Sequence, residues 1–350
     1  MPALLGVNAN IGIALSQVAD TYGVAEAVTE KLVVESITWN ENVTKLQSAG
    51  IGSGGKFTDN LARGTTAGTV TITGLCGYNN GFPLLLAQFM GTAGAPTEQN
   101  NPEGDWLHAI EFNSSVNRVF LTVAIESSST TVIEFPSVTV NSLTITGTPG
   151  DYLRYTAECN FDELIDTSPT NNNAAIQALT QTDTELAVCA FEETFQINAQ
   201  GGVALSVSDN LAITSFELNM AQPQSFKPEI KGSAGNSVPT SDDKATGTLT
   251  VQLKEHDDNT YETAAQAATE YKSALNVQGT QIGSGDNKTI ELLCPRLILL
   301  DTPDFGLANP GNNPQTLVFD IADASANPTG MTDTTPYANI TNEQTTAYIS

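Results

Sequence analysis

Apolar and polar residues alternate along much of the chain, a pattern that predicts half-buried β-strands. In Ser36–Asn40, Ile37 and Trp39 alternate with polar neighbours, and Tyr152–Phe161 alternates in the same way. The turn sequence Thr148-Pro-Gly-Asp151 before that run predicts a β-hairpin. Other segments with strand character are Gly68–Leu75, Trp106–Phe112, Val119–Glu126, Thr131–Phe135, Val138–Ile145, Ile213–Asn219, Gly247–Leu253, Thr289–Leu300 and Gln315–Ile321.

Helical signals are few. Asn79-Asn-Gly-Phe-Pro83 supplies a start for a helix over Leu84–Met90. An apolar stripe predicts a longer helix over Thr260–Leu275, with core packing as its role. A short helical piece is expected over Asn173–Leu179. The chain is therefore predicted to be mainly β.

The first strand, loop, strand and helix recur later in the chain at nearly one offset. Adding 179 takes Ser36 to Ser215 and Gly68 to Gly247, and it takes the segment Gly81–Gly91 to Thr260–Glu270, where the second helix begins. Such self-similarity predicts a duplicated domain.

The expected organisation is an N-terminal arm (1–33), a first domain (34–166), a linker (167–190), a second domain (191–323) and a polar C-terminal tail (324–350). Each domain is predicted to be a β-sandwich or half-barrel with a flanking helix. The tail is expected to be a surface strap or a loose end.

Charge is the strongest global feature. The chain has 13 lysine and arginine residues against 39 aspartate and glutamate residues, a formal net charge of −26. A surface this acidic repels phosphate, so a protein that grips nucleic acid is disfavoured. Two explanations remain open: solubility or a saline habitat, and a surface past which a polyanion slides without sticking.

The sequence gives no sign of an active site. Gly50-Ile-Gly-Ser-Gly-Gly55 approaches a phosphate-binding loop, but Phe57 stands where a hydroxyl is required. Glu255-His-Asp-Asp258 is better explained as a solvated loop than as a metal cluster. We therefore expect a protein that is not an enzyme, with no cofactor and no metal.

The four cysteines lie far apart, which is typical of free thiols in a reducing compartment. No signal peptide is apparent, and the apolar run Phe82–Met90 is too short to span a bilayer. We expect synthesis in a cytoplasm and no membrane insertion.

Several motifs together resemble the tail tube proteins of long-tailed bacteriophages, over about residues 6–323. The linker and the tail after Asp323 depart from that pattern. The matching motifs are Gly6-Val-Asn-Ala-Asn10, Asp20-Thr-Tyr-Gly23, Gly68-Thr-Val-Thr-Ile72, Phe82-Pro-Leu-Leu-Leu-Ala-Gln-Phe-Met-Gly-Thr92, Val138-Thr-Val-Asn-Ser-Leu-Thr-Ile145, Tyr155-Thr-Ala-Glu-Cys-Asn-Phe161, Ile213-Thr-Ser-Phe-Glu-Leu-Asn219 and Ala245-Thr-Gly-Thr-Leu-Thr-Val251.

The resemblance implies a virion protein made in the host bacterial cytoplasm, whose copies form rings stacked into a tube through which DNA passes without adhering. A duplicated chain would give a trimeric ring of pseudo-sixfold symmetry. Further implied partners are the tail tip or baseplate, the tape measure and the tail terminator.

The resemblance also implies that rings stack through the long loops Gln47–Thr66 and Ser225–Lys244 and through the N-terminal arm. Basic residues in these loops either pair with acidic surface on the next ring or are merely solvated. These candidate contacts are Lys56, Arg63, Lys227, Lys231 and Lys244.

Other hypotheses remain. A different β-rich virion protein, such as a tail terminator or a head decoration protein, would share this composition. A carbohydrate-binding module is disfavoured by the two tryptophans and the lack of clustered aromatic residues.

Overall fold

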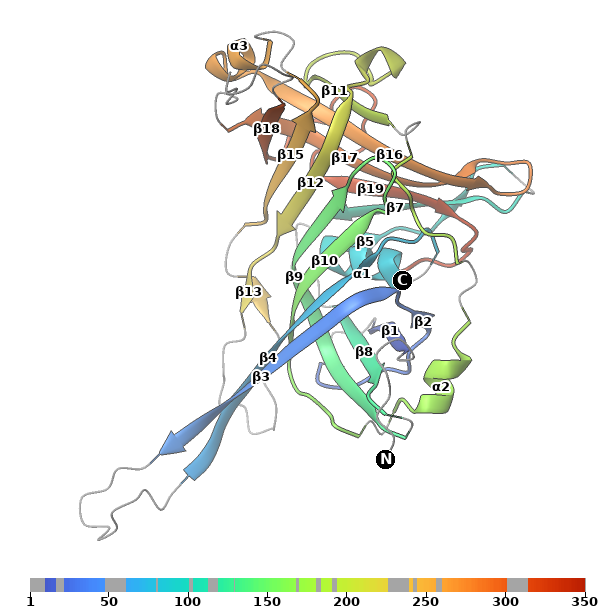
Figure 1. The fold of residues 1–350 in the computed structure, drawn as a ribbon, viewed down its shortest axis with the longest axis vertical. Helices are drawn as coiled ribbons and strands as arrows, with labels where there is room; N and C mark the ends of the chain where they lie inside the picture. The colour runs from blue at the N-terminus through green and yellow to red at the C-terminus, as the bar shows by residue number, and fades with distance from the viewer. Residues whose placement is uncertain are drawn as a thin grey trace.

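The chain is dominated by antiparallel strands in the computed structural model (Figure 1). Hydrogen bonding joins seventeen strands into one connected sheet, beside a separate two-stranded pair. The predicted mainly-β class is thus confirmed. The structure describes residues 10–16, 22–47, 61–79, 81–100, 103–112, 119–128, 130–167, 170–180, 184–190, 194–225, 239–241, 244–255, 260–300 and 314–349.

The first half of the chain contains a set of long strands, several short ones and two helices. They are β1 (Ile11–Ser16), β2 (Glu30–Lys31), β3 (Val34–Gln47), β4 (Leu61–Leu75), α1 (Gly81–Met90), β5 (Gly91–Ala93), β6 (Thr97–Glu98), β7 (Trp106–Phe112), β8 (Phe120–Glu126), β9 (Val132–Gly147), β10 (Arg154–Phe161) and α2 (Asn173–Ala178).

The second half has a similar sequence of elements, followed by one more strand. They are β11 (Thr194–Ala199), the 3-10 turn η3 (Val207–Asp209), β12 (Ile213–Ala221), β13 (Gln224–Ser225), β14 (Thr240–Ser241), β15 (Thr246–Leu253), α3 (Thr260–Gln266), β16 (Glu270–Gln281), β17 (Asn287–Leu299), β18 (Gln315–Ile321) and β19 (Tyr337–Asn342).

One strand order occurs twice. In the first half, pairing runs β1-β8-β9-β10-β4-β3. In the second, it runs β11-β16-β17-β18-β15-β12. The register repeats at the sequence offset of 179, because Ile37 faces Ile72 and Phe216 faces Val251.

Local irregularities repeat as well. A register shift after Val34 recurs after Ile213. β9 pairs with β8 as far as Val138, two residues after Pro136. Beyond that point it pairs with β10 and β12. β17 changes partner from β19 to β18 across Pro295. Proline lacks the N–H that a continuous ladder needs, so each proline stands where the strand turns from one layer to the next.

The two strand sets are not separate in the structure. Strand β12 of the second set pairs along β9 of the first, from Phe216 opposite Gly147 to Ala221 opposite Ser142. The division at 34–166 and 191–323 therefore stays a prediction, because one continuous sheet runs through both parts.

Helix α1 is buried along its whole length and lies in the interior of the fold (Figure 1). Its aromatic and aliphatic side chains belong to one hydrophobic cluster with residues from both halves. Apolar side chains all round are typical of a helix enclosed by protein. The predicted helix over Leu84–Met90 is confirmed.

The predicted helix over Thr260–Leu275 is wrong in its second half. α3 ends at Gln266, and Leu275 lies in β16. Ala268 adopts a left-handed conformation with φ of 49°. The N–H of Ala268 donates to Ala265 and that of Thr269 to Ala264. These two bonds form the helix-ending motif in which glycine usually holds the left-handed position.

The described parts of both terminal segments are built into the fold. β1 pairs with β8 of the same chain. β19, from the tail, lies between β17 and β7 with Tyr337, Ala338 and Ile340 buried. The expectation of a surface strap or loose end is therefore wrong for this part of the tail. Within the predicted linker, α2 forms where a short helix was expected.

Three carboxylates tie distant segments together. Asp105 accepts N–H groups of Asn100 and Asp286 at 2.9 and 2.8 Å. Glu126 accepts from the N-terminal segment and from α2, and Glu185 accepts from β16 and β17. Burial alone would raise the pKa of each carboxyl, but these hydrogen bonds outweigh it and lower the net pKa of all three.

We expect Ala268→Gly to raise the free energy of unfolding by about 1 kcal/mol, because a left-handed residue with a Cβ costs that order of energy. Ala265→Gly, inside α3, is the matched control and should lower it by about 1 kcal/mol. Urea denaturation followed by circular dichroism measures both. Destabilisation by Ala268→Gly would contradict this description of the helix end.

Replacing Glu126 tests the carboxylate ties. A lowered folded-state pKa contributes stability above the ordinary carboxyl pKa of about 4.3, and this contribution is lost as the pH falls through the lower folded-state value. Glu126→Gln should therefore lower the midpoint of thermal unfolding at neutral pH, and the gap to the wild type should shrink as the pH falls below the ordinary carboxyl pKa. Glu343→Gln, at an exposed side chain, is the control. A gap that is independent of pH would contradict the assignment.

Candidate assembly surface

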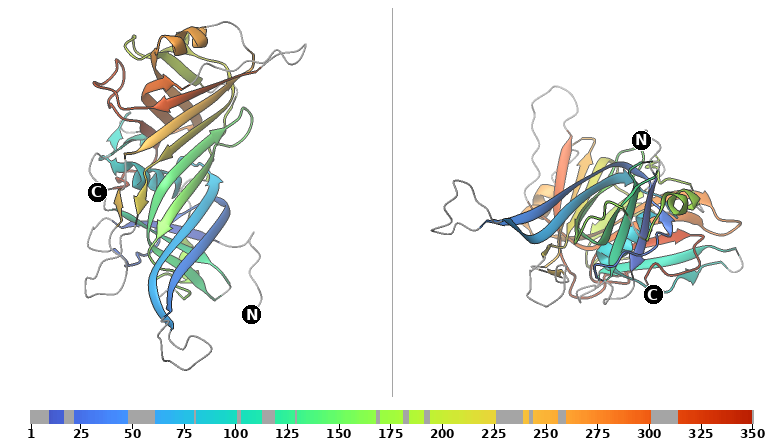
Figure 2. Two further views of the ribbon diagram at one scale, coloured as in Figure 1. Left: turned by 90° about the vertical axis from the view of Figure 1, so that its left-hand side faces the viewer. Right: turned by 90° about the horizontal axis from the view of Figure 1, so that it is seen from below.

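One face of the continuous sheet is polar across seven neighbouring strands. These strands pair in the order β3-β4-β10-β9-β12-β15-β18, and Figure 2 (left) shows them side by side. Side chains on the inner face, such as Val70, Leu218 and Phe319, are buried. Strict alternation then places the polar residues outside.

We call these outward residues the polar face. They are Ser36, Thr38, Asn40, Thr69, Thr71, Thr73, Ser142, Thr144, Thr146, Arg154, Thr156, Glu158, Asn160, Ser215, Glu217, Asn219, Thr248, Thr250, Gln252, Thr316, Val318 and Asp320.

Hydroxyl and amide groups on the polar face bond to one another across strands. Thr73 and Thr156 share a hydrogen bond between hydroxyls at 3.3 Å, and the Asn219 amide donates to Thr144 Oγ1 at 3.1 Å. The Ser142 hydroxyl donates to the Glu158 carboxylate at 3.1 Å. These cross-strand pairs stabilise the sheet and leave a neutral, hydrated surface between scattered carboxylates.

Positive charge on the polar face is neutralised. Arg154 is the one lysine or arginine among the described side chains of these seven strands. Its guanidinium forms ion pairs with Glu35 and, at 3.3 Å, with Asp151. The Tyr152 N–H and then Arg154 lower the pKa of the Asp151 carboxyl, so this partner stays ionised. The remaining charges on the face, at Glu158, Glu217 and Asp320, are negative.

Strand β3 forms one end of this sheet. It pairs with β4 along one side, and within the described ranges no strand pairs with its other side. Its counterpart β12 pairs on that other side with β9. Trp39 on β3 is 40% exposed. An open edge of this kind is a template for pairing with another strand.

The β3–β4 hairpin continues beyond the sheet as an arm (Figure 1). β10 follows β4 only as far as Gly68 opposite Phe161, whereas β3 and β4 stay paired out to Gln47 opposite Leu61. In the second half, the short β13–β14 pair extends the matching β12–β15 hairpin. A two-stranded ribbon is marginally stable alone, so such an arm gains from contact with a partner.

Two of the five predicted contact residues, Arg63 and Lys244, lie in the part of the chain that the structure describes. Arg63 lies in β4, opposite Lys45, and not in a loop as expected, because the strand begins at Leu61. Lys244 is exposed just before β15. Lys56, Lys227 and Lys231 lie outside the described residues.

Sequence reasoning missed the polar face and the β3 edge. The alternating threonines of Thr69-Val-Thr-Ile-Thr73 and Thr248-Leu-Thr250 signalled the face. Which strand ends the sheet depends on pairing between distant segments, and a local pattern does not reveal that.

Among the described residues, no group of three or more histidine, cysteine or acidic side chains could hold a metal ion. The four cysteines are buried, and none is in a disulfide bond. His108 is buried against Tyr348, and burial lowers its pKa. No helix in the described ranges is long and apolar enough to cross a membrane.

Introducing lysines on the polar face is expected to create DNA binding. The variant Glu158→Lys, Glu217→Lys, Asp320→Lys should bind duplex DNA with a slope of log affinity against log salt of about −0.9 for each phosphate neutralised. Fluorescence anisotropy measures this, with Glu98→Lys, Glu255→Lys, Glu343→Lys as the control of equal charge. Equal binding by both variants would show that position on the face is irrelevant.

Comparison with models of protein families and with the curated proteins finds no match for this chain.

Proposed function

We propose that this chain is a structural subunit that assembles with its own copies into rings, which stack into a tube like that of a bacteriophage tail. The polar face lines the channel, and DNA passes along it without adhering. Synthesis in the host cytoplasm and incorporation into the virion belong to the same proposal, as do contacts with tail tip, tape measure and terminator proteins.

The observation that carries the proposal is the repeated strand plan joined at β9–β12. A chain with two equivalent units already contains one junction between them, and a second junction of the same kind would connect the chain to the next copy. If each copy is related to the next by the same rotation, the copies close into a ring when the rotation angle is a whole fraction of a full turn. Three copies would supply six units.

The hydrogen-bond pattern of the internal junction indicates how copies would meet. The N–H of Gln222 donates to the carbonyl of Asn141 at 2.7 Å. Because donors alternate along a strand, Phe216, Leu218 and Met220 also point their N–H groups towards β9. The β3 counterparts of Phe216 and Leu218, at the offset of 179, are Ile37 and Trp39.

The chemistry of the polar face supports passage of DNA. Hydroxyl and amide groups offer weak, exchangeable hydrogen bonds, and the scattered carboxylates repel phosphate. Arg154, which would otherwise attract phosphate, is paired with Glu35 and Asp151. The polar face would therefore present no site that binds DNA tightly enough to halt its passage.

Trp39→Pro tests the β3 edge. It removes one edge N–H and should raise the concentration needed for assembly by about tenfold or more, since a lost backbone hydrogen bond costs ~1 kcal/mol at each of several junctions. Trp39→Ala is the matched control, because it loses the same contact with Phe135 but keeps the N–H. Light scattering over a concentration series measures both.

If Trp39→Pro and Trp39→Ala assemble equally well, β3 is not the contact. If the wild type stays monomeric at every concentration and virions of its parent phage lack it along the tail shaft, the proposed function fails.

A further inference from the structure

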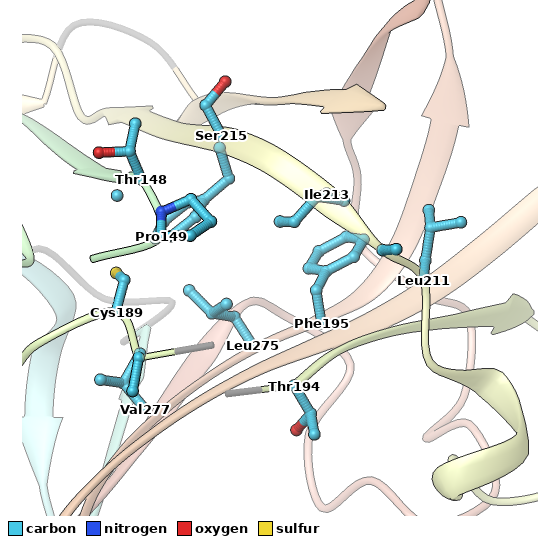
Figure 3. A pocket seen from close by; sticks show the side chains of 14 residues that line it. Thr148, Pro149, Cys189, Thr194, Phe195, Leu211, Ile213, Ser215, Leu275 and Val277 are labelled. Carbon is cyan, nitrogen blue, oxygen red and sulfur yellow. The ribbon is translucent and has the colours of Figure 1, made fainter. Parts of the chain in front are cut away.

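An apolar pocket lies where the first half of the chain meets the second (Figure 3). The Thr148–Pro149 turn and Cys189 form one side, and residues from β11, β12 and β16 form the other. Its volume is about 190 Å³. An apolar cavity of about 150 Å³ is large enough to hold benzene, so this pocket has room for one small organic molecule.

Side chains on the floor of the pocket are hydrophobic and buried. Phe195 is 4% exposed, Phe216 6% and Leu275 9%, and Val277 is fully buried. Figure 3 shows Phe195, Leu275 and Ile213 directed towards a common space. Apolar ligand surface that is buried against these side chains would contribute roughly 25 cal/mol per Å².

The rim of the pocket is polar but uncharged. It carries the hydroxyl-bearing residues Thr148, Thr194 and Ser215, and no charged side chain is among the described residues that line the pocket. A ligand with a carboxylate or phosphate would lose hydration without gaining a cation. The lining therefore selects a neutral molecule with an apolar body.

The first half offers a direct comparison. The N–H of Leu211 donates to the carbonyl of Phe195, and in the same way the N–H of Leu32 donates to the carbonyl of Ile11. Ile11 and Leu32 belong to the hydrophobic cluster that includes the wholly buried α1. α3, the counterpart of α1, buries only Ala264. The second half thus has no comparable described helix in its interior.

We infer that this pocket is a binding site for one small, neutral, apolar molecule, of the size of a monocyclic aromatic compound. All residues of the site belong to one chain, so binding can be measured without rings or tubes. Occupation would stabilise the junction between the Thr148–Pro149 turn and the second half.

Toluene is the probe that tests this inference, and benzoate is its charged counterpart. Toluene should bind saturably to one site per chain in isothermal titration calorimetry and should raise the midpoint of thermal unfolding. Benzoate at the same concentration should do neither. No saturable binding of toluene up to its solubility limit would overturn the inference.

Paired variants locate the site. Ile213→Trp places a large side chain in the pocket and should weaken toluene binding at least tenfold. Thr214→Trp is the matched control, because Thr214 is exposed, donates to the Gln252 carbonyl and does not line the pocket. The affinity of this control variant for toluene should be unchanged. Unaltered binding by a folded Ile213→Trp variant would place the ligand elsewhere and overturn the inference.

A second readout does not depend on a variant. Cys189 lines the pocket and is 7% exposed, so its modification by methyl methanethiosulfonate, followed by mass spectrometry, should slow when toluene is present. The rate at Cys294, which is buried outside the pocket, should not change. Equal slowing at both cysteines, or no slowing at Cys189, would contradict the assignment.

Discussion

The rest of the structure depends on the hydrogen-bonded junction between β9 and β12. It converts two similar sets of strands into one sheet, and it fixes their register from Phe216 opposite Gly147 onwards. Because side chains alternate along a strand, a slip of one residue would turn the polar side chains into the core. The junction thus keeps seven strands presenting one polar face.

The same junction explains why one edge stays open. Strand β12 finds its partner within the chain, whereas β3, its counterpart, has no described partner strand beyond β4. A chain in which one of two equivalent strand edges is paired internally and the other is open is suited to joining further copies through the open edge. The β3–β4 arm, which extends past the sheet, adds a second element that gains from a neighbour.

Much of the secondary structure could be predicted from local patterns. The turn at Thr148–Asp151 has Gly150 at φ of 84° and a hydrogen bond from the N–H of Asp151 to the carbonyl of Thr148, as its sequence indicated. β7 spans the predicted Trp106–Phe112. In these places proline, glycine and alternation encode the structure locally.

The errors arose where distant partners decide the outcome. Tyr271 and Leu275 fit a helical stripe, but pairing of β16 with β11 and β17 makes that segment a strand. β19 lies in a polar tail and becomes a buried strand because β7 and β17 pair with it on both sides. For the assembly surface, the excess of acidic residues was visible in the sequence. The polar face and the open edge depend on the order in which distant strands pair, which the sequence does not show.

In the proposed assembly, copies of this chain join through the β3 edge into rings with the polar face inside. An electron cryo-microscopy reconstruction of the assembled wild-type protein tests it most directly. We expect a tube of stacked rings, three copies in each, with β3 of one copy beside the second half of the next and Thr144, Thr156 and Thr248 facing the channel. A tube whose polar face points outwards, or whose rings join through other strands, would contradict it.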